Sequence, residues 1–207
     1  MEDSESSIFS NIRAQTSVQL IGTSRAFDYL HSRDPPCIHG DLHPVRLSPP
    51  APSPSRNSYS YQLQNQILLD NVDEPLVADY GFSRILYEPS RSMTRALSGG
   101  KPAYLAPEIT DGEAERPTTS SDIYALGMTF YAILSRQEPF PAIRSPWAQM
   151  KAARNKQRPE QIPFPWFTVD QNDRLWGLLR GMWDHSGAKR PDAREVLEVL
   201  VDIRNHK

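Results

Sequence analysis

The sequence contains a single cysteine, Cys37, among its 207 residues. One cysteine cannot form an intramolecular disulfide, so the disulfide framework of small secreted domains is excluded. Long apolar runs are also absent, and nothing approaches the ~18 consecutive apolar residues of a membrane-spanning helix. The first residues are acidic and polar and lack the basic and apolar regions of a secretory signal. We therefore expect a cytoplasmic protein, with the nucleus as the alternative compartment, and no membrane association.

The chain also lacks a strong excess of charge of either sign. It has 23 Lys and Arg residues against 25 Asp and Glu, a formal net charge of −2. Proteins whose main task is to bind nucleic acid usually carry a basic surface, so we expect no nucleic-acid partner. Hydrophobic residues make up 38% of the chain and charged residues 23%, which is ordinary for a globular protein. The length is sufficient for one hydrophobic core.

Most of the chain has the hydrophobic periodicity of helices. The first predicted helix covers residues 8–33 and ends at Asp34-Pro35-Pro36, because proline has no amide donor and restricts the residue before it. One face of this helix is expected to carry Val18, Ile21, Ala26, Tyr29 and Leu30.

A second predicted helix, over residues 123–134, is apolar on nearly all sides. Such a helix must be buried, so we place it at the centre of the fold. Directly before it stand four N-cap candidates, Thr119, Ser120, Ser121 and Asp122. Further helices are predicted over residues 146–156, 171–184 and 191–205, the last with Pro191 in its first turn.

Strands are few. Cys37-Ile38 reads as a short buried strand, and residues 66–70 and 75–79 are predicted to form a hairpin around residues 71–74. The predicted fold class is therefore α+β, mainly α, in one domain over residues 1–207.

Residues 45–64 interrupt this domain. They are rich in proline and serine and have no periodicity, so they can bury too little apolar surface to offset the entropy cost of ordering. We predict a disordered insert. Val45-Arg46 and Gln64 can be encoded by splice-site sequences, which favours a retained intron; a true surface insertion is the alternative.

Four short motifs follow one another along the chain, and a fifth lies near its end. They are His39-Gly40-Asp41-Leu42-His43, Asp79-Tyr80-Gly81, Ala106-Pro107-Glu108, the run SDIYALG at residues 121–127, and Lys189-Arg190-Pro191. In this order they resemble the HRDLK catalytic loop, the DFG metal-binding motif, the APE motif, the buried central helix and the conserved arginine of protein kinases. The run LWGLLRGMWD at residues 175–184 is similar to tyrosine-kinase-like Ser/Thr kinases, and the HGDL variant to their fungal members.

The resemblance implies the large, mostly helical C-terminal lobe of a protein kinase, with a short β-hairpin near the catalytic loop. It implies transfer of a phosphoryl group from ATP to a serine or threonine hydroxyl of a protein, with tyrosine as the other acceptor. Positioning and charge neutralisation dominate this chemistry. Asp41 would orient the attacking hydroxyl or accept its proton, and His43 would stand where the family has a lysine near the transferred phosphate. The implied partners are a protein substrate or a binding protein.

The resemblance also implies ATP and magnesium as cofactors. Asp79 would hold magnesium against the phosphates, because a hard cation prefers carboxylate oxygen. Gln66 would supply the amide oxygen beside it, with Asn65, one place out of register, as the alternative ligand. Leu68 would contribute to the ATP site. From the residues alone, Asp41 could instead cap a turn, and Asp79 could form an Asx-turn before Gly81.

Six positions have structural roles in the family: His39, Tyr80, Gly81, Glu108, Asp122 and Arg190. His39 and Tyr80 would stack in the hydrophobic column that joins the two lobes. Glu108 and Arg190 would form a largely buried, bidentate ion pair, and Asp122 would bind the backbone of the catalytic loop. From the residues alone, Asp122 is most simply an N-cap, and the alternative for Glu108 and Arg190 is that they are two unrelated surface charges.

Several family features are not found. No glycine-rich phosphate loop and no lysine precede Asp41, so the N-terminal lobe is expected to be missing and this chain to be inactive. Gly40 replaces the arginine that docks an activation-loop phosphate. His43, with an unperturbed pKa of about 6.5, would be mostly neutral at pH 7. Lys101 replaces a threonine and is either a source of the missing charge or a solvated lysine.

Two other functions remain open. Small-molecule phosphotransferases of the aminoglycoside or choline kinase type favour HGDLHP, which residues 39–44 match, but they lack the APE motif and the arginine at the position of Arg190. A non-catalytic pseudokinase that binds other proteins is the second alternative.

Overall fold

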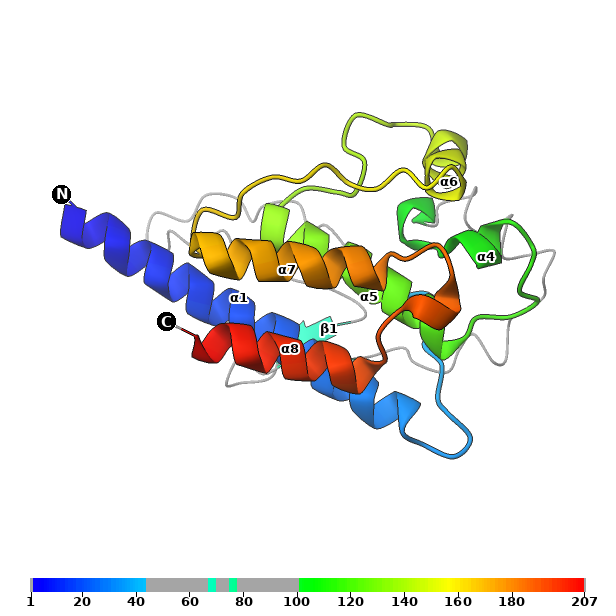
Figure 1. Cartoon of the computed structure of the whole chain (residues 1–207), viewed down its shortest axis with the longest axis horizontal. Coiled ribbons are helices and arrows are strands. Elements are labelled where there is room, and N and C mark those ends of the chain that lie inside the picture. Colours follow the sequence, from blue (N-terminus) through cyan, green and yellow to red (C-terminus); the bar gives the residue numbers. More distant parts are fainter. Residues whose placement is uncertain (1, 44–66, 70–74, 78–100, 207) are drawn as a thin grey trace.

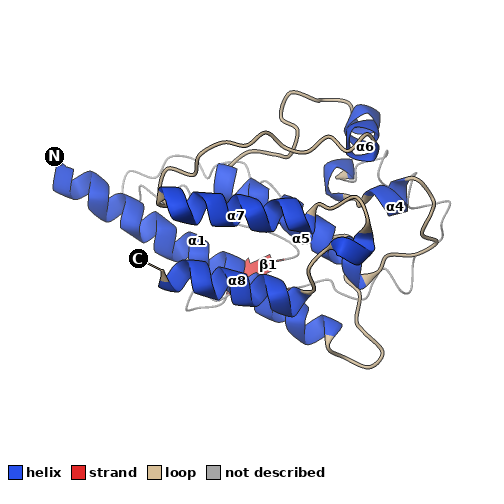
Figure 2. Ribbon diagram, in the orientation of Figure 1, coloured by secondary structure: helices blue, strands red, loops and turns tan. Residues whose placement is uncertain are grey.

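The computed structural model describes residues 2–43, 67–69, 75–77 and 101–206. In these ranges the chain is mostly helical (Figures 1 and 2). The elements, in chain order, are α1 (Glu2–His31), β1 (Ile67–Leu69), β2 (Pro75–Val77), the 3-10 helix η1 (Pro102–Tyr104), α4 (Pro107–Thr110), α5 (Thr119–Ser135), α6 (Pro146–Arg154), α7 (Val169–Met182), the 3-10 helix η2 (Gly187–Lys189) and α8 (Ala193–Asn205). None of the described helices combines the length and apolar character needed to cross a lipid bilayer.

Helix α5 forms the centre of the core, as its uniformly apolar sequence predicts. Ile123, Tyr124, Leu126, Met128 and Phe130 are each no more than 1% exposed. Helices α1 and α7 and the 3-10 helix η1 all pack against it. Burying a large apolar side chain contributes about 1.5–3 kcal/mol, so α5 supplies a large share of the stabilisation that fixes the fold.

The start of α5 differs from the prediction. Its N-cap is Thr118, one residue before the four candidates, and its hydroxyl accepts the N–H of Ser121 at 3.1 Å. The Ser121 hydroxyl in turn accepts the N–H of Thr118 at 2.8 Å, which closes a capping box. The interpretation of Asp122 as an N-cap is therefore wrong, and its carboxylate is available for another role.

Helix α1 is the longest element, and α8 packs along it (Figure 1). Leu20, Ile21, Phe27 and Leu30 face the core. The predicted apolar face was partly wrong, because Tyr29 is 60% exposed and lies beneath the guanidinium of Arg33. Two buried hydroxyls, of Thr23 and Ser24, occupy part of the true inner face and bond the carbonyls four residues earlier.

The C-terminal end of α7 packs closely against α5 at a glycine. A Cβ at Gly127 would lie 2.8 Å from Nε1 of Trp183, so only glycine permits this approach. The Trp183 ring contacts Tyr131 and Trp176 edge-on at 6.2 Å, and Trp176 stacks on Phe164 at 5.4 Å. Such aromatic pairs add roughly 0.5–1.5 kcal/mol each beyond the area they bury.

Other boundaries shift slightly from the predictions. Helix α6 ends at Arg154 and α7 covers Val169–Met182. Pro191 lies outside α8, because Asp192 is the N-cap and accepts the N–H of Glu195. Cys37-Ile38 does not form a strand; both residues are half-buried in an irregular segment after α1.

Strands β1 and β2 pair antiparallel, with Leu68 opposite Leu76. The turn that would join them, residues 70–74, lies outside the described residues, so the predicted hairpin stays a prediction. The predicted insert at residues 45–64 lies outside them as well.

Candidate active site

The motif at residues 39–43 forms an irregular segment that follows α1 and crosses toward the start of α5. His39 and Leu42 are buried, at 1% and 2% exposure, whereas Asp41 and His43 are half-buried. Gly40 has φ of 78°, a backbone conformation that glycine adopts without steric cost. The backbone thus gives a physical reason for glycine at this position.

The carboxylate of Asp122 holds this segment in place. Its two oxygens accept the backbone N–H of His39 and of Gly40, each at 2.8 Å. Asp122 is 1% exposed, and Nε2 of His31 lies 3.0 Å from one of the same oxygens. Because a carboxylate oxygen accepts, Nε2 of His31 donates to it. A buried carboxylate needs such partners, and here they come from α1 and from the segment beside Asp41.

His39 also orients Asp41 directly. Its Nδ1 accepts the backbone N–H of Asp41 at 3.3 Å. The imidazole of His39 therefore holds the backbone of Asp41, the residue for which the resemblance implies a catalytic role. The ring stacks on Phe27 of α1 at 5.9 Å, and Phe27 meets His31 edge-on at 5.5 Å. The stacking partner predicted for His39, Tyr80, lies outside the described residues.

The segment before the APE motif lies beside residues 39–43. The Tyr104 ring at the end of η1 is 6.2 Å from the ring of His43. The Tyr104 hydroxyl donates to Oε2 of Glu138 at 2.7 Å, and Nζ of Lys101 pairs with Oε1 of the same carboxylate at 2.9 Å. Glu138 therefore holds both ends of η1. Lys101 is not simply solvated, because its ammonium pairs with Glu138. A role beside the transferred phosphate stays a prediction, since the residues expected to hold the phosphates lie outside the described residues.

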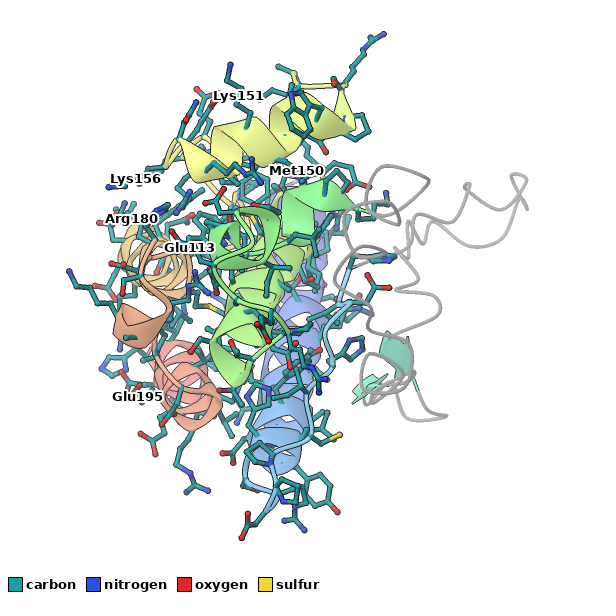
Figure 3. All side chains as sticks on the ribbon, turned by 90° about the vertical axis from the view of Figure 1, so that its right-hand side faces the viewer. Glu113, Met150, Lys151, Lys156, Arg180 and Glu195 are labelled. Atoms are coloured by element: carbon teal, nitrogen blue, oxygen red, sulfur yellow. The ribbon has the colours of Figure 1, made fainter. Side chains whose placement is uncertain are left out.

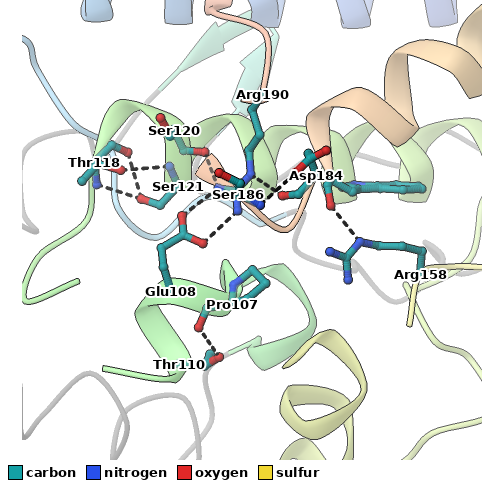
Figure 4. A network of polar contacts seen from close by, with 11 residues as sticks. Pro107, Glu108, Thr110, Thr118, Ser120, Ser121, Arg158, Asp184, Ser186 and Arg190 are labelled. Atoms are coloured by element: carbon teal, nitrogen blue, oxygen red, sulfur yellow. Dashed lines mark hydrogen bonds and ion pairs between the residues drawn. The ribbon is translucent and has the colours of Figure 1, made fainter. Parts of the chain in front are cut away.

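Glu108 and Arg190 lie 82 positions apart and form a bidentate ion pair (Figure 4). The two guanidinium–carboxylate distances are 2.7 and 2.8 Å. The Arg190 guanidinium also donates to the carbonyls of Ser120 and Asp184, at 2.8 and 2.9 Å. The Arg190 side chain is fully buried and that of Glu108 is 17% exposed. The alternative of two unrelated surface charges is therefore wrong.

Tyr124 of α5 lies between two guanidinium groups. Arg190 is 5.1 Å and Arg158 5.5 Å from the centre of its ring, within the range of cation–π attraction. Arg158 also donates to the carbonyl of Trp183 at 2.8 Å (Figure 4). Burial raises the pKa of Tyr124 to about 12, against a smaller opposing effect of the two arginines, so the phenol stays neutral at physiological pH.

The residues predicted to hold ATP and magnesium are not placed. Asn65, Gln66, Asp79, Tyr80 and Gly81 lie outside the described residues, and of Leu68 only the backbone pairing in β1 is described. In the part of the chain that the structure describes, no three His, Cys, Asp or Glu side chains converge as a metal site would require. The predicted magnesium ligands thus stay a prediction.

Sequence reasoning missed His31, Tyr104 and Glu138. Each acts through a side-chain contact between separate elements, over 91 positions for His31 and Asp122 and 34 for Tyr104 and Glu138. Tyr104 stands two residues before Ala106-Pro107-Glu108, where the motif spacing could have drawn attention to it. Neither His31 nor Glu138 belongs to a motif that the sequence analysis used.

Comparison with known proteins places the chain in a family. The sequence model of the protein kinase domain matches residues 63–200, more than half of the chain. Similar proteins include receptor-interacting serine/threonine-protein kinase 2 of Bos taurus, which is 29% identical over 185 residues that cover 85% of this chain and 29% of that protein. The dual specificity protein kinase splA of Dictyostelium discoideum is 26% identical over 187 residues, which cover 88% of this chain and 7% of the length of splA.

Serine/threonine-protein kinase CTR1 of Arabidopsis thaliana is 24% identical over 177 residues, which cover 86% of this chain and 18% of that protein. The chain thus spans less than a third of the length of each of these relatives. The five ordered motifs, the helical fold and the family match agree. The chain belongs to the protein kinase superfamily.

Proposed function

We propose that the protein transfers the terminal phosphoryl group of ATP to a serine or threonine hydroxyl of a protein substrate, with Asp41 as the residue that orients that hydroxyl and accepts its proton. The observation that carries the proposal is the position of Asp41. It follows two backbone amides that are held by the buried Asp122, and its own amide is held by His39. A backbone fixed in this way limits the positions that the Asp41 carboxylate can take, so it can meet a bound hydroxyl with less loss of entropy.

The neighbouring residues suit a protein substrate. His43 follows Asp41 by two positions and contacts Tyr104, at the end of the η1 segment that Glu138 holds. This segment leads into Glu108, whose pairing with Arg190 ties it to the end of α7 and the start of α8. A rigid surface beside Asp41 can therefore position a peptide. The relatives above are named as protein kinases, which supports a protein acceptor over a small molecule.

Magnesium and ATP would be held by Asp79 with Gln66 or Asn65, and with Leu68 at the ATP site. Carboxylate and amide oxygens are suitable ligands for a hard cation, and magnesium would neutralise the charge on the transferring phosphoryl group. We place residues 1–207 in one kinase domain, interrupted at residues 45–64. The cytoplasm, or the nucleus, is the proposed location.

Replacing Asp41 by Asn tests this function. In the protein purified from its source, we expect Asp41→Asn to reduce transfer of labelled phosphate from ATP to serine- and threonine-containing proteins by about 10²–10⁴-fold, the usual contribution of general base catalysis. Asp28→Asn, a partly buried carboxylate of α1 paired with the exposed Arg194, is the matched control and should leave transfer unchanged. Equal transfer by the wild-type protein and Asp41→Asn would contradict the proposal.

The 207 residues by themselves are expected to bind ATP–Mg weakly. They contain no G-x-G-x-x-G sequence and no lysine before Lys101, so the phosphates have no backbone cradle and no paired cation. Calorimetric titration of the purified chain should give a dissociation constant above about 10 μM, equivalent to roughly −7 kcal/mol. A tighter, saturable constant would show that the chain holds nucleotide without these elements.

A non-catalytic role as a protein-binding pseudokinase is the second candidate. It is favoured by Gly40 and His43, which stand where kinases have an arginine and a lysine. The same transfer assay separates the two functions, because a pseudokinase would show no transfer that depends on Asp41.

A further inference from the structure

The segment from Pro139 to Pro159 differs in charge from the rest of the chain. It contains five basic residues and no acidic one, although the chain as a whole has a net charge of −2. The segment includes all of α6 and the loop that leads into it from α5. A local excess of positive charge on one exposed element attracts partners of opposite charge.

Two of the five cations are used within the fold. Arg158 donates to backbone carbonyls, including that of Trp183, and lies against Tyr124. Arg154 pairs with Asp111 at the C-terminal side of α6. The other three, Arg144, Lys151 and Lys156, are exposed and form no ion pair with any residue that the structure describes. Free charge is therefore concentrated at the loop before α6 and on its outer face.

An exposed tryptophan accompanies these charges. Trp147 in the first turn of α6 is 50% exposed, whereas Trp176 and Trp183 are at most 2% exposed. Met150 of the same helix is 1% exposed and points toward the body of the protein, and Lys151 points away from it (Figure 3). Trp147 and Lys151, four residues apart, share the outer face. Their surroundings are apolar, since Pro141, Ala142 and Pro146 are exposed too.

We propose that Arg144, Trp147 and Lys151 form a docking surface for an acidic segment of a partner protein. An apolar side chain of that segment would cover the Trp147 ring, and its Asp or Glu carboxylates would pair with Arg144 and Lys151. Tryptophan and arginine are the residue types that most often dominate binding energy in protein interfaces. None of these three residues belongs to the segment that carries Asp41, and the proposed binding does not depend on phosphoryl transfer.

The chemistry of the surface favours a protein over other anionic partners. The affinity of a protein for nucleic acid comes largely from the number of phosphates that its cations neutralise, and three exposed cations can neutralise few. Binding to anionic lipid commonly needs clusters of about 4–8 basic residues. Asp111 pairs with Arg154 and not with these three cations, and Glu113 lies on the side of α6 away from Lys151 (Figure 3).

The test uses the 207-residue chain and fluorescein-labelled peptides. We expect EEDLFDEE to bind with a dissociation constant on the order of 100 μM or tighter, and to shift the emission of Trp147 as its ring leaves water. EEDGGDEE, which lacks the apolar anchor, and KKNLFNKK, of opposite charge, should bind at least ~10-fold more weakly.

Variants locate the binding. Trp147→Ala and the double variant Arg144→Glu/Lys151→Glu should each weaken binding by ~10-fold or more. The matched control, Arg194→Glu/Arg204→Glu, makes the same charge change on exposed residues of α8 and should bind like the wild-type chain. All these side chains are exposed, and an unchanged thermal midpoint would show that each variant is folded.

Several results would overturn the proposal. They are absence of binding by EEDLFDEE, equal binding of EEDGGDEE, an equal loss in the α8 control, and unchanged binding by Trp147→Ala. Tighter binding of a twenty-residue oligothymidylate or of phosphatidylserine vesicles through the same residues would assign the surface to nucleic acid or lipid instead.

Discussion

Arg190→Ala is expected to lower the free energy of unfolding by roughly 3–5 kcal/mol, because it leaves the mostly buried carboxylate of Glu108 unpaired. The change also removes the donors to the carbonyls of Ser120 and Asp184. A typical domain is stable by about 5–15 kcal/mol, so the variant should unfold at a much lower denaturant concentration or fail to express in soluble form. Urea unfolding followed by tryptophan fluorescence measures the difference.

Additivity shows whether the two residues act as a pair. Glu108→Ala should cost a similar amount, and the double variant should cost less than the sum of the two, because removing both charges leaves neither one buried alone. Arg174→Ala is the matched control: its partner Asp202 is exposed, and exposed ion pairs contribute little net stability. Small, additive losses for Glu108→Ala and Arg190→Ala, like that of the control, would mean that the pair is not buried.

The central helix was predictable because its sequence is apolar on every side, and only one place in the core suits such a helix. Its exact start was not predictable. Residues 118–122 all have side chains able to cap a helix, and tertiary contacts decide among them. The inner face of α1 was misjudged for a similar reason. Thr23 and Ser24 count as polar in a pattern, yet they are buried because their hydroxyls bond within the helix.

The candidate site, too, was predictable only in part: the sequence indicated its motif residues but not the contacts that hold them. The order of the motifs brought Asp41, Glu108 and Arg190 to attention without any structure. The contacts that hold Asp41 in place could not be read from the sequence, since His31 reaches Asp122 and Glu138 reaches Tyr104 only after the helices have packed. Polar pairs between elements leave no periodic signal in a sequence, whereas apolar faces do.

Asp122→Ala should destabilise the protein by roughly 2–6 kcal/mol, because two backbone N–H groups lose their buried acceptor and each unpaired group costs about 1–3 kcal/mol. Those groups belong to His39, which is 1% exposed, and to Gly40. Asp122→Asn should cost less, because its amide oxygen can still accept one of the two bonds. Chemical unfolding of the purified variants gives both values.

Thr118→Ala is the matched control for this change at the same end of α5. It removes the N-cap hydroxyl and should cost about 1 kcal/mol without affecting residues 39–43. If Asp122→Ala and Thr118→Ala lose the same small amount, Asp122 contributes only to the helix end, and the proposed support of the segment that carries Asp41 is wrong.

Hydrogen exchange at the amides of His39 and Gly40 tests most directly whether the buried core holds the segment that carries Asp41. In the wild-type chain both amides should exchange slowly, because each donates to Asp122 at 2.8 Å. In Asp122→Asn at least one should exchange much faster, while the amides in the middle of α7 and α8 stay protected. Rapid exchange of both amides in the wild-type chain would contradict the geometry on which the assignment of Asp41 depends.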